Sequence, residues 1–275
     1  MIFYIFSNCK FTTFFKKTST KTCQPRKKEE KIFCMDRKSY LCTLKKISNP
    51  MTIQEAIQAR HSVRQYLQKP LTEEQKEQLN HRIAEINRQA DLHLQLVLDD
   101  PKAFDGRLAH YGKFSGVENL IALVGKKQPT LSQRLGYYGA ELCLSAQMMG
   151  LNTCWVGLTY SRTENMLIGP DEAIKGVMCI GHGATQGQQH PMKAATRIAP
   201  GYDQAPEWFR RGIDAVLLAP SALNQFRVTF RLLADGTVEA KAGLSPYAKI
   251  DLGIFCYYFE LGAGKEYFRW AKALW

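Results

Sequence analysis

The feature that most constrains the fold is a helical segment that is apolar on most of its sides. Residues 131–149 are rich in Leu, Ala, Tyr and Met, and Gly150 follows directly. Glycine often ends a helix, so Gly150 is expected to be the C-cap. A helix with apolar residues around much of its circumference has to be buried. We therefore expect residues 131–149 to form the central core helix of the domain.

Helices and strands alternate irregularly around this segment. Thr52 and Glu55 form a capping box that predicts a helix ending near Arg60. Asp235-Gly236 is a hairpin turn signal. Periodicity and turn residues predict further helices over 70–89, 206–218 and 250–261, strands over 92–98, 119–125, 153–156, 174–181, 225–233 and 237–240, and a loop over 182–204. This order indicates a mixed α+β layer fold.

The positive charge of the chain is concentrated at its start. Residues 1–50 hold 12 Lys/Arg and 3 Asp/Glu, a net of +9, whereas residues 51–275 hold 25 and 22, a net of +3. We expect residues 1–50 to be a disordered or non-native basic leader, with Met51 as the natural start. A targeting or nucleic-acid-binding tail is the alternative, and nucleic-acid binding would be salt-sensitive. Residues 51–275 are expected to form the folded domain, with no nucleic-acid partner.

Cysteine and histidine usage argues against metal sites. Cys143, Cys154, Cys179 and Cys256 are scattered through apolar segments, and no Cys or His residues have zinc-site spacing. We expect these four to be reduced, buried thiols of an intracellular, cytoplasmic protein. No apolar run reaches the roughly 18 residues of a membrane span, so no membrane partner is expected.

A cluster of cationic and hydroxyl side chains follows the first predicted helix. Arg60, Ser62 and Arg64 occupy alternate positions. If the chain is extended there, alternate side chains share a face and all three could contact one anion. Arginine binds phosphate bidentately, and a hydroxyl adds a hydrogen bond. The alternative is a solvated basic helix end.

This cluster lies in a segment that resembles the opening of the FMN-dependent nitroreductases. The matching residues are Ala-Arg-His-Ser-Val-Arg-Gln-Tyr at 59–66, followed by Lys-Pro-Leu at 69–71. In that family the segment holds the FMN phosphate and ribityl chain. The resemblance implies these roles for Arg60, Ser62 and Arg64, with His61 adding backbone or ring contacts.

Two more segments carry the resemblance. Gly-Leu-Asn-Thr-Cys-Trp-Val-Gly at 150–157 is similar to the segment whose backbone lies beside the isoalloxazine, which implies contacts from Gly157 and Leu158. An ordinary loop glycine is the alternative for Gly157. Downstream of Gly-His-Gly at 181–183, the family places a basic residue against the flavin phosphate. We favour Arg197 over Lys193 for this role, and exposed basic loop residues are the alternative.

A fourth segment, Ala-Pro-Ser-Ala-Leu-Asn at 219–224, resembles the element that reaches the flavin from the partner subunit in ordinary nitroreductases. A Pro-Ser-x-x-Asn turn leaves backbone N–H groups and an Asn amide free. The resemblance implies that Pro220, Ser221 and Asn224 bind the cofactor. The family's following Gln-Pro-Trp-Arg-Phe is replaced here by Gln-Phe-Arg-Val-Thr-Phe at 225–230, which lacks the Pro-Trp pair.

The late position of this element, together with Asp-Leu-Gly-Ile at 251–254, resembles the TM nitroreductase branch of the family. The resemblance implies a nitroreductase-like α+β fold in which helices flank a central mixed or antiparallel sheet. It also implies pseudo-two-fold halves in one chain, with the larger half at 51–204 and the smaller half at 205–275 completing the flavin site. A monomer that is an internal pseudo-dimer is then favoured over a homodimer.

The function that the resemblance implies is an FMN-dependent NAD(P)H oxidoreductase. Such an enzyme reduces electron-poor small molecules, such as nitroaromatics or quinones, by ping-pong hydride transfer. Because the flavin carries the chemistry, no side chain is assigned as catalytic. The alternative is a flavin-binding sensor or storage protein without efficient turnover.

Overall fold

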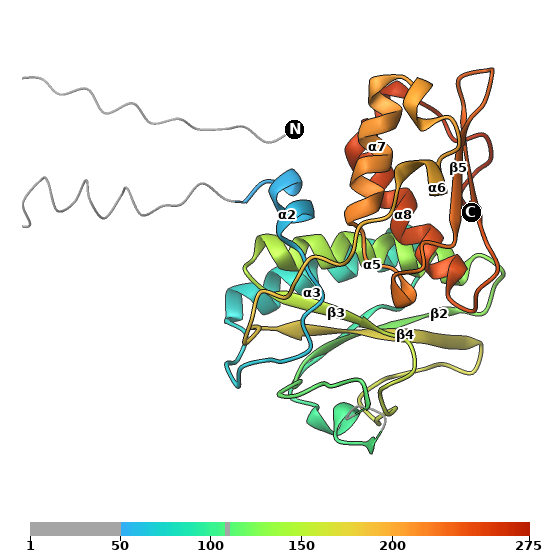
Figure 1. The fold of residues 1–275 in the computed structure, drawn as a ribbon. Helices are drawn as coiled ribbons and strands as arrows, with labels where there is room; N and C mark the ends of the chain where they lie inside the picture. The colour runs from blue at the N-terminus through green and yellow to red at the C-terminus, as the bar shows by residue number, and fades with distance from the viewer. Residues whose placement is uncertain (1–50, 108–110) are drawn as a thin grey trace, which may run out of the picture. The chain divides into compact units, whose positions relative to one another are not determined.

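The structure, a computed structural model, describes residues 51–107 and 111–275 (Figure 1). The expectations for residues 1–50 lie outside the described residues. The described part combines an antiparallel sheet with packed helices, which confirms the predicted α+β class.

The main sheet has four strands in the order β1-β2-β4-β3, and all neighbours are antiparallel. Its strands are β1 (Gln95–Val97), β2 (Leu120–Lys126), β3 (Asn152–Val156) and β4 (Glu172–Gly181). The strand predicted over 92–98 is shorter because Asp91 has a left-handed φ of 44° and Leu92 forms only an isolated bridge with Gly125. Strand β3 lies at one edge of the sheet, where other segments can pair with it.

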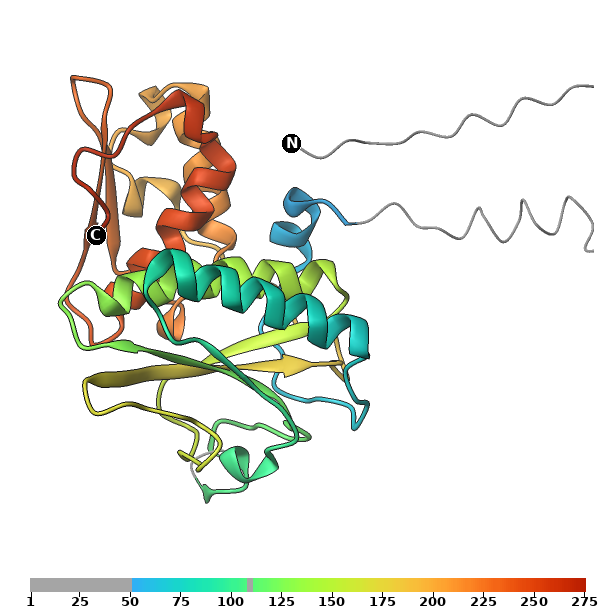
Figure 2. The same ribbon diagram turned by 180° about the vertical axis from the view of Figure 1, so that it is seen from behind.

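Helix α5 (Leu131–Met148) lies across one face of this sheet, with α3 (Glu73–Ala90) alongside it (Figure 2). Apolar side chains of α5, among them Leu135 and Leu142, are buried in one cluster with Ile121 and Met178 of the sheet. The predicted central helix is therefore confirmed. Its C-cap is Met149, and the predicted cap Gly150 is the next residue, with a left-handed φ of 74°.

The opposite face of the sheet is covered by loops and by the short helix η1 (Pro101–Phe104). Phe104, Phe114 and Met166 are buried there against alternate residues of the strands. The sheet is thus covered on both faces, which explains why β2 and β4 are apolar along most of their length.

Helix α2 (Ile53–Ala59) begins at the predicted capping box, which the structure confirms. The Thr52 hydroxyl accepts a hydrogen bond from the Glu55 N–H at 3.3 Å, and the Glu55 carboxylate accepts one from the Thr52 N–H at 2.7 Å. The helix ends at its C-cap, Arg60, whose backbone is extended. The chain therefore leaves α2 in the conformation that the anion-site hypothesis requires.

The C-terminal part contains α7 (Glu207–Leu218), the hairpin of β5 (Val228–Leu232) and β6 (Val238–Ala242), and α8 (Ala248–Ala263). These elements enclose an aromatic core that includes Phe209, Phe230, Phe255 and Phe259. The region predicted as a loop over 182–204 contains two short helices, α6 (Ala195–Ile198) and η2 (Tyr202–Gln204). Two more short helices, η3 (Ala222–Asn224) and η4 (Lys265–Tyr267), follow α7 and α8.

The order of elements repeats within the chain. The succession α3-β1-β2-α5 recurs as α7-β5-β6-α8, and the strands within each succession form an antiparallel pair. The two last helices, α5 and α8, cross closely at Gly136 and Gly253. A Cβ atom would lie 2.1 Å from the Ile250 carbonyl oxygen at Gly136, and 1.9 Å from the Gln133 carbonyl oxygen at Gly253. The two glycines therefore permit the approach of the repeated helices.

Candidate functional site

The segment after α2 lies along the edge strand β3. The Val63 N–H donates to the Thr153 carbonyl oxygen at 3.1 Å, and Ser62 pairs with Thr153 in a short parallel bridge. The Val63 side chain is buried, so the side chains of the adjacent residues Ser62 and Arg64 lie on the other face of the extended chain. Burial raises the pKa of the Cys154 thiol, while the Arg64 and Arg60 guanidiniums oppose this shift. Both guanidiniums thus lie within electrostatic range of Cys154. The shared face of Arg60, Ser62 and Arg64 stays a prediction.

Arg60 is a buried cation with an incomplete set of partners. Its side chain is 3% exposed, its Nη2 donates to the Leu218 carbonyl oxygen at 3.3 Å, and its Nε has no partner within the described residues. The Tyr258 hydroxyl, also buried and without a partner there, lies close enough for the guanidinium to act on its pKa. A solvated basic helix end is therefore wrong for Arg60.

The second predicted segment follows α7 directly, next to the Arg60 contact. Pro220 is buried, and the Ser221 hydroxyl is buried with no partner among the described residues. The Asn224 amide donates to the Pro191 carbonyl oxygen at 3.0 Å, and the Ala222 N–H donates to the Asp251 carboxylate at 3.1 Å. The prediction that this turn leaves these donors free is therefore wrong, because both are bonded within the chain. Leu223 and Asn224 both have a left-handed φ of 54°. An orphaned hydroxyl and strained backbone are features that cluster at binding sites.

His190 was not predicted as a site residue, and it contacts the residues on both sides of the 219–224 segment. Its Nε2–H donates to the Leu217 carbonyl oxygen at 3.0 Å, and its ring lies 5.6 Å from the ring of Phe226. Burial lowers the pKa of His190, and the charges of Arg60, His61 and Lys193 lower it further. The sequence signal was absent because His190 lies in an irregular region whose path depends on long-range contacts.

The residues around this junction form a cationic cluster, which comprises Arg60, His61, Arg64, His190 and Lys193. Burial lowers the pKa of His61, and the charge of Arg60 adds to the effect. Arg64 is exposed and lies 5.9 Å from the centre of the Phe114 ring. Across residues 51–107 and 111–275, none of the five forms an ion pair with a carboxylate. The charges of Arg60, Arg64 and Lys193 fit an anionic group such as a phosphate. The two histidines, whose pKa values are lowered, add N–H donors and no charge near neutral pH.

The predicted residues Gly157 and Leu158 follow β3 directly. A Cβ atom at Gly157 would lie 2.5 Å from the ring of Tyr247, the N-cap of α8, so a larger residue at 157 would require this ring to move. Leu158 is 72% exposed. Because a strand rises about 3.3 Å per residue, Gly157 lies roughly 13 Å along the edge from the Thr153 bridge. Strand β3 thus carries the cationic cluster at one end and a glycine loop at the other.

Arg197 is a predicted site residue that has no hydrogen bond or ion pair with the cluster among the described residues. It lies on α6, is exposed, and forms no ion pair with the described residues. Lys193, the alternative, lies within electrostatic range of His190. The assignment of Arg197 to the phosphate stays a prediction.

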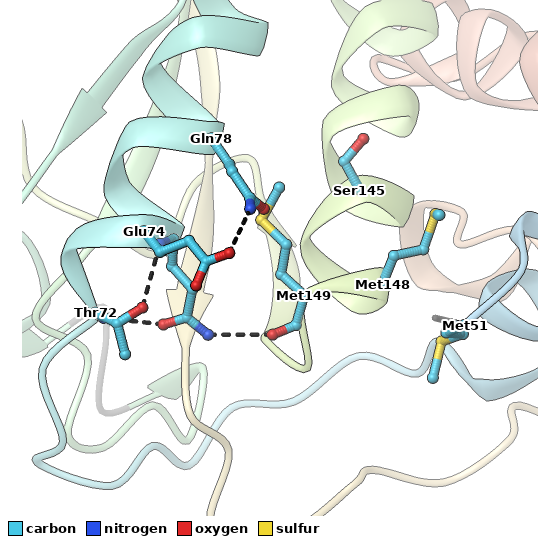
Figure 3. A pocket seen from close by; sticks show the side chains of 8 residues that line it. Met51, Thr72, Glu74, Gln78, Ser145, Met148 and Met149 are labelled. Atoms are coloured by element: carbon cyan, nitrogen blue, oxygen red, sulfur yellow. Dashed lines mark hydrogen bonds between the residues drawn. The ribbon is translucent and has the colours of Figure 1, made fainter. Parts of the chain in front are cut away.

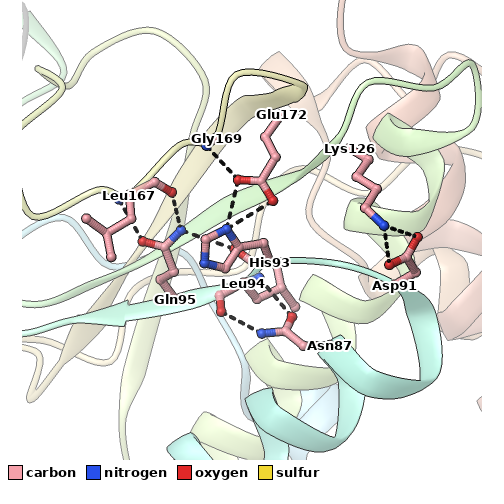
Figure 4. A network of polar contacts seen from close by, with 9 residues as sticks. All are labelled: Asn87, Asp91, His93, Leu94, Gln95, Lys126, Leu167, Gly169 and Glu172. Atoms are coloured by element: carbon pink, nitrogen blue, oxygen red, sulfur yellow. Dashed lines mark hydrogen bonds and ion pairs between the residues drawn. The ribbon is translucent and has the colours of Figure 1, made fainter.

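Two other features lie apart from the predicted residues. A surface hollow of about 520 Å³ is lined by α3 and the end of α5, together with Met51, and the Gln75 amide donates to the Met149 carbonyl oxygen there at 3.1 Å (Figure 3). At the far edge of the sheet, His93 pairs with Glu172 at 2.8 Å within a network that ties β1 to the residues before β4 (Figure 4). Neither includes a predicted site residue.

The described residues contain no group of three or more His, Cys, Asp or Glu side chains that could hold a metal ion. The four cysteines Cys143, Cys154, Cys179 and Cys256 are buried free thiols, which confirms that part of the prediction. Among the helices of residues 51–107 and 111–275, none has both the length and the apolar character needed to cross a membrane.

Residues 52–263 match the family described as "Putative TM nitroreductase". A crystal structure of a "putative nitroreductase" from Thermotoga maritima is similar at a TM-score of 0.60 and 21% identity, covering 81% of this chain and 88% of that one. This likeness confirms the predicted nitroreductase-like fold. No curated protein matches the chain.

Weaker likenesses extend over about half of this chain. A "putative nitroreductase in complex with FMN" from Desulfovibrio desulfuricans has a TM-score of 0.42 and 18% identity, with coverage of 55% of this chain and 95% of that one. An FMN-dependent nitroreductase from Clostridium difficile has a TM-score of 0.39 and 14% identity, with coverage of 50% and 90%.

Proposed function

Because the chain belongs to the TM nitroreductase family, and with it to the oxidoreductases, we propose that it is an FMN-dependent NAD(P)H oxidoreductase. The observation that carries the proposal is the cationic cluster at the start of β3. It holds a buried guanidinium whose Nε has no partner in the described chain and which donates to Leu218. Three residues after Leu218, the Ser221 hydroxyl is also buried without a partner there. Buried polar groups are nearly always hydrogen-bonded, so these atoms indicate a polar ligand.

The chain's residues divide into three groups around the proposed cofactor. Arg60, Ser62 and Arg64, with His61, hold the phosphate and ribityl chain, because they supply cationic donors and a hydroxyl on one face. Pro220, Ser221 and Asn224 lie at the polar edge of the ring system, where the Ser221 hydroxyl, unpartnered among the described residues, and the Asn224 side-chain amide bind its heteroatoms. Gly157 and Leu158 lie beside the ring, where the lack of a side chain on Gly157 permits a close approach.

Bound FMN would supply the redox chemistry, taking a hydride from NAD(P)H and passing it to an electron-poor acceptor, such as a nitroaromatic or quinone, in a ping-pong cycle. The protein contributes charge pairing at the phosphate, orientation of the ring, and donors that favour negative charge at its polar edge. No side chain is proposed to transfer a proton.

We also propose that one chain builds the whole site. The contacts of Arg60 with Leu218 and of His190 with Leu217 connect the 51–204 half with the end of α7, and the contact of Asn224 with Pro191 connects it with the turn that follows. In ordinary nitroreductases the resemblance places that element on a partner subunit. Here the same chain would provide that element, which agrees with the repeated order of helices and strands.

The test is an anaerobic titration of the purified protein. FMN is added first and binding is followed by quenching of flavin fluorescence. NADPH or NADH is then added, and the visible absorbance of the flavin is followed before and after 1,4-benzoquinone or nitrobenzene. Fast bleaching, with reoxidation that the acceptor accelerates, supports the oxidoreductase. Slow bleaching that no acceptor affects favours the sensor or storage protein, and an absence of FMN binding contradicts the cofactor assignment.

A further inference from the structure

The turn after α7 has a backbone conformation that its residues do not favour. Leu223, Asn224 and Phe226 have positive φ values of 54°, 54° and 50°. Only glycine, and to a lesser degree Asn and Asp, adopt the left-handed region readily. Two of the three residues are large and apolar, so the turn keeps this shape only if neighbouring groups hold it.

One buried carboxylate holds the turn at its start. Both oxygens of Asp251 lie near the Ala222 N–H, with Oδ1 at 3.1 Å and Oδ2 at 3.2 Å from the nitrogen. Asp251 lies in the first turn of α8 and is 4% exposed. Ala222 directly precedes the first left-handed residue and directly follows Ser221. The carboxylate therefore acts on the backbone between the orphaned hydroxyl and the strained residues.

The carboxylate has no cationic partner. It forms no ion pair within the described chain, and the Ala222 N–H is its hydrogen-bond donor there. Burial raises the pKa of Asp251 to about 7, which shows how poorly this environment solvates the charge. A buried carboxyl with one backbone donor contributes little to stability, so its contact with the turn needs another reason.

We propose that Asp251 is a positioning residue for the flavin site: by holding the Ala222 N–H, it fixes the strained turn that directs Ser221 and Asn224 at the cofactor. This inference rests on the proposed function. It assigns Asp251 no contact with the cofactor itself, and it explains why a costly carboxyl lies at the start of α8.

Two substitutions remove the same hydrogen bond from opposite sides. Asp251→Leu removes the acceptor. Asp251→Asn is the conservative comparison, because it keeps an acceptor oxygen in a side chain of the same shape. Ala222→Pro removes the donor. The backbone allows this change, because Ser221 has the extended φ of −142° and ψ of 155° that a residue before proline prefers, and proline is favoured at the first position of a helix.

The matched control is Glu260, a second buried carboxylate on α8. It is 7% exposed and binds Trp270 and Lys265 at the other end of the helix, away from the 221–224 turn. Glu260→Gln tests whether a loss of buried charge on α8 by itself changes the site. Thermal melts of the FMN-free variants exclude those that do not fold.

Asp251→Leu and Ala222→Pro are each expected to weaken FMN binding about tenfold, the scale of one lost hydrogen bond to a charged group. Their effects should not add in the double variant, because both remove one bond. Asp251→Asn and Glu260→Gln should bind FMN as the wild type does. Additive losses, or equal losses from Asp251→Asn and Asp251→Leu, would overturn the positioning role.

Amide hydrogen exchange of the FMN-free proteins separates this inference from the proposed function. Asp251→Leu should raise exchange over residues 219–226, and Glu260→Gln should not. If the wild type binds no FMN, the proposed function fails and the exchange data alone decide whether Asp251 holds the turn. Unchanged exchange over 219–226 in folded Asp251→Leu would overturn the inference in either case.

Discussion

The environment of Arg60 favours the binding of an anion. It is buried, and its guanidinium donates to the neutral carbonyl oxygen of Leu218, which cannot balance its charge. An unbalanced buried charge is costly, and a bound phosphate would offset that cost. The same residue contacts the end of α7, so it links the two segments that the proposed site combines.

Arg60→Ala is expected to weaken FMN binding by about 2–3 kcal/mol, the loss of a charge-assisted contact. Fluorescence titration of the variant measures this, with Arg88→Ala as the control, because Arg88 is an exposed arginine on α3. An affinity for FMN equal to that of the wild type would remove Arg60 from the site.

Asp251 makes stability depend on pH. Its pKa is about 7 in the folded protein, against a usual value of 3.8, so between these values the folded state holds a proton that the unfolded state has released. The stabilisation from this proton is complete below pH 3.8 and is lost as the pH rises through about 7. Asp251→Asn should therefore gain stability over the wild type at roughly pH 8 and not at roughly pH 4. Urea unfolding at both pH values measures this, and an equal difference at both would contradict the shift.

At the scale of elements, the crossing of α5 and α8 depends on two glycines. Gly136 and Gly253 leave no room for a Cβ atom, because backbone oxygens lie about 2 Å from where it would be. The crossing places α8, and with it Asp251 and Tyr247, against the elements that carry the site. Changes at the crossing should therefore affect both stability and the site.

Gly253→Ala is expected to destabilise the fold by about 3 kcal/mol, because the added methyl group meets backbone that cannot move aside easily. Gly201→Ala is the comparison. It has a positive φ of 85° but open space around it, so its cost is only the backbone strain of about 1 kcal/mol. Urea unfolding of both variants measures the difference, and equal losses would show that the crossing tolerates a side chain.

Elements with local signals could be predicted from the sequence. The capping box of Thr52 and Glu55, the apolar helix α5 and the hairpin at Asp235-Gly236 each depend on residues close together in the chain. Strand β1 is shorter than predicted because of the left-handed Asp91, and the region over 182–204 contains two short helices that its composition did not indicate.

The candidate site could be predicted only where a segment carries its own pattern. The alternation of Arg60, Ser62 and Arg64 is local, so the extended chain that follows α2 was predictable. The contacts of Arg60 with Leu218, of His190 with Leu217 and of Asp251 with Ala222 join residues far apart in the chain. No periodicity or spacing encodes such contacts, which is why the burial of Arg60 and the places of His190 and Asp251 were not predicted.

At the scale of the whole molecule, one chain repeats the succession of a helix, two strands and a helix. The second copy supplies α7 and the turn after it, and the end of α7 accepts hydrogen bonds from Arg60 and from His190. If the flavin site is complete within one chain, a homodimer is not required for cofactor binding. The proposal therefore makes a prediction about stoichiometry that separates this chain from ordinary nitroreductases.

The most direct test is sedimentation velocity of the purified protein with FMN, recorded at both a protein and a flavin wavelength. The proposed single-chain site predicts that flavin sediments with the monomer at one FMN per chain. Flavin that sediments only with a dimer, or a monomer that carries no flavin, would contradict the claim that the two halves of one chain build the site.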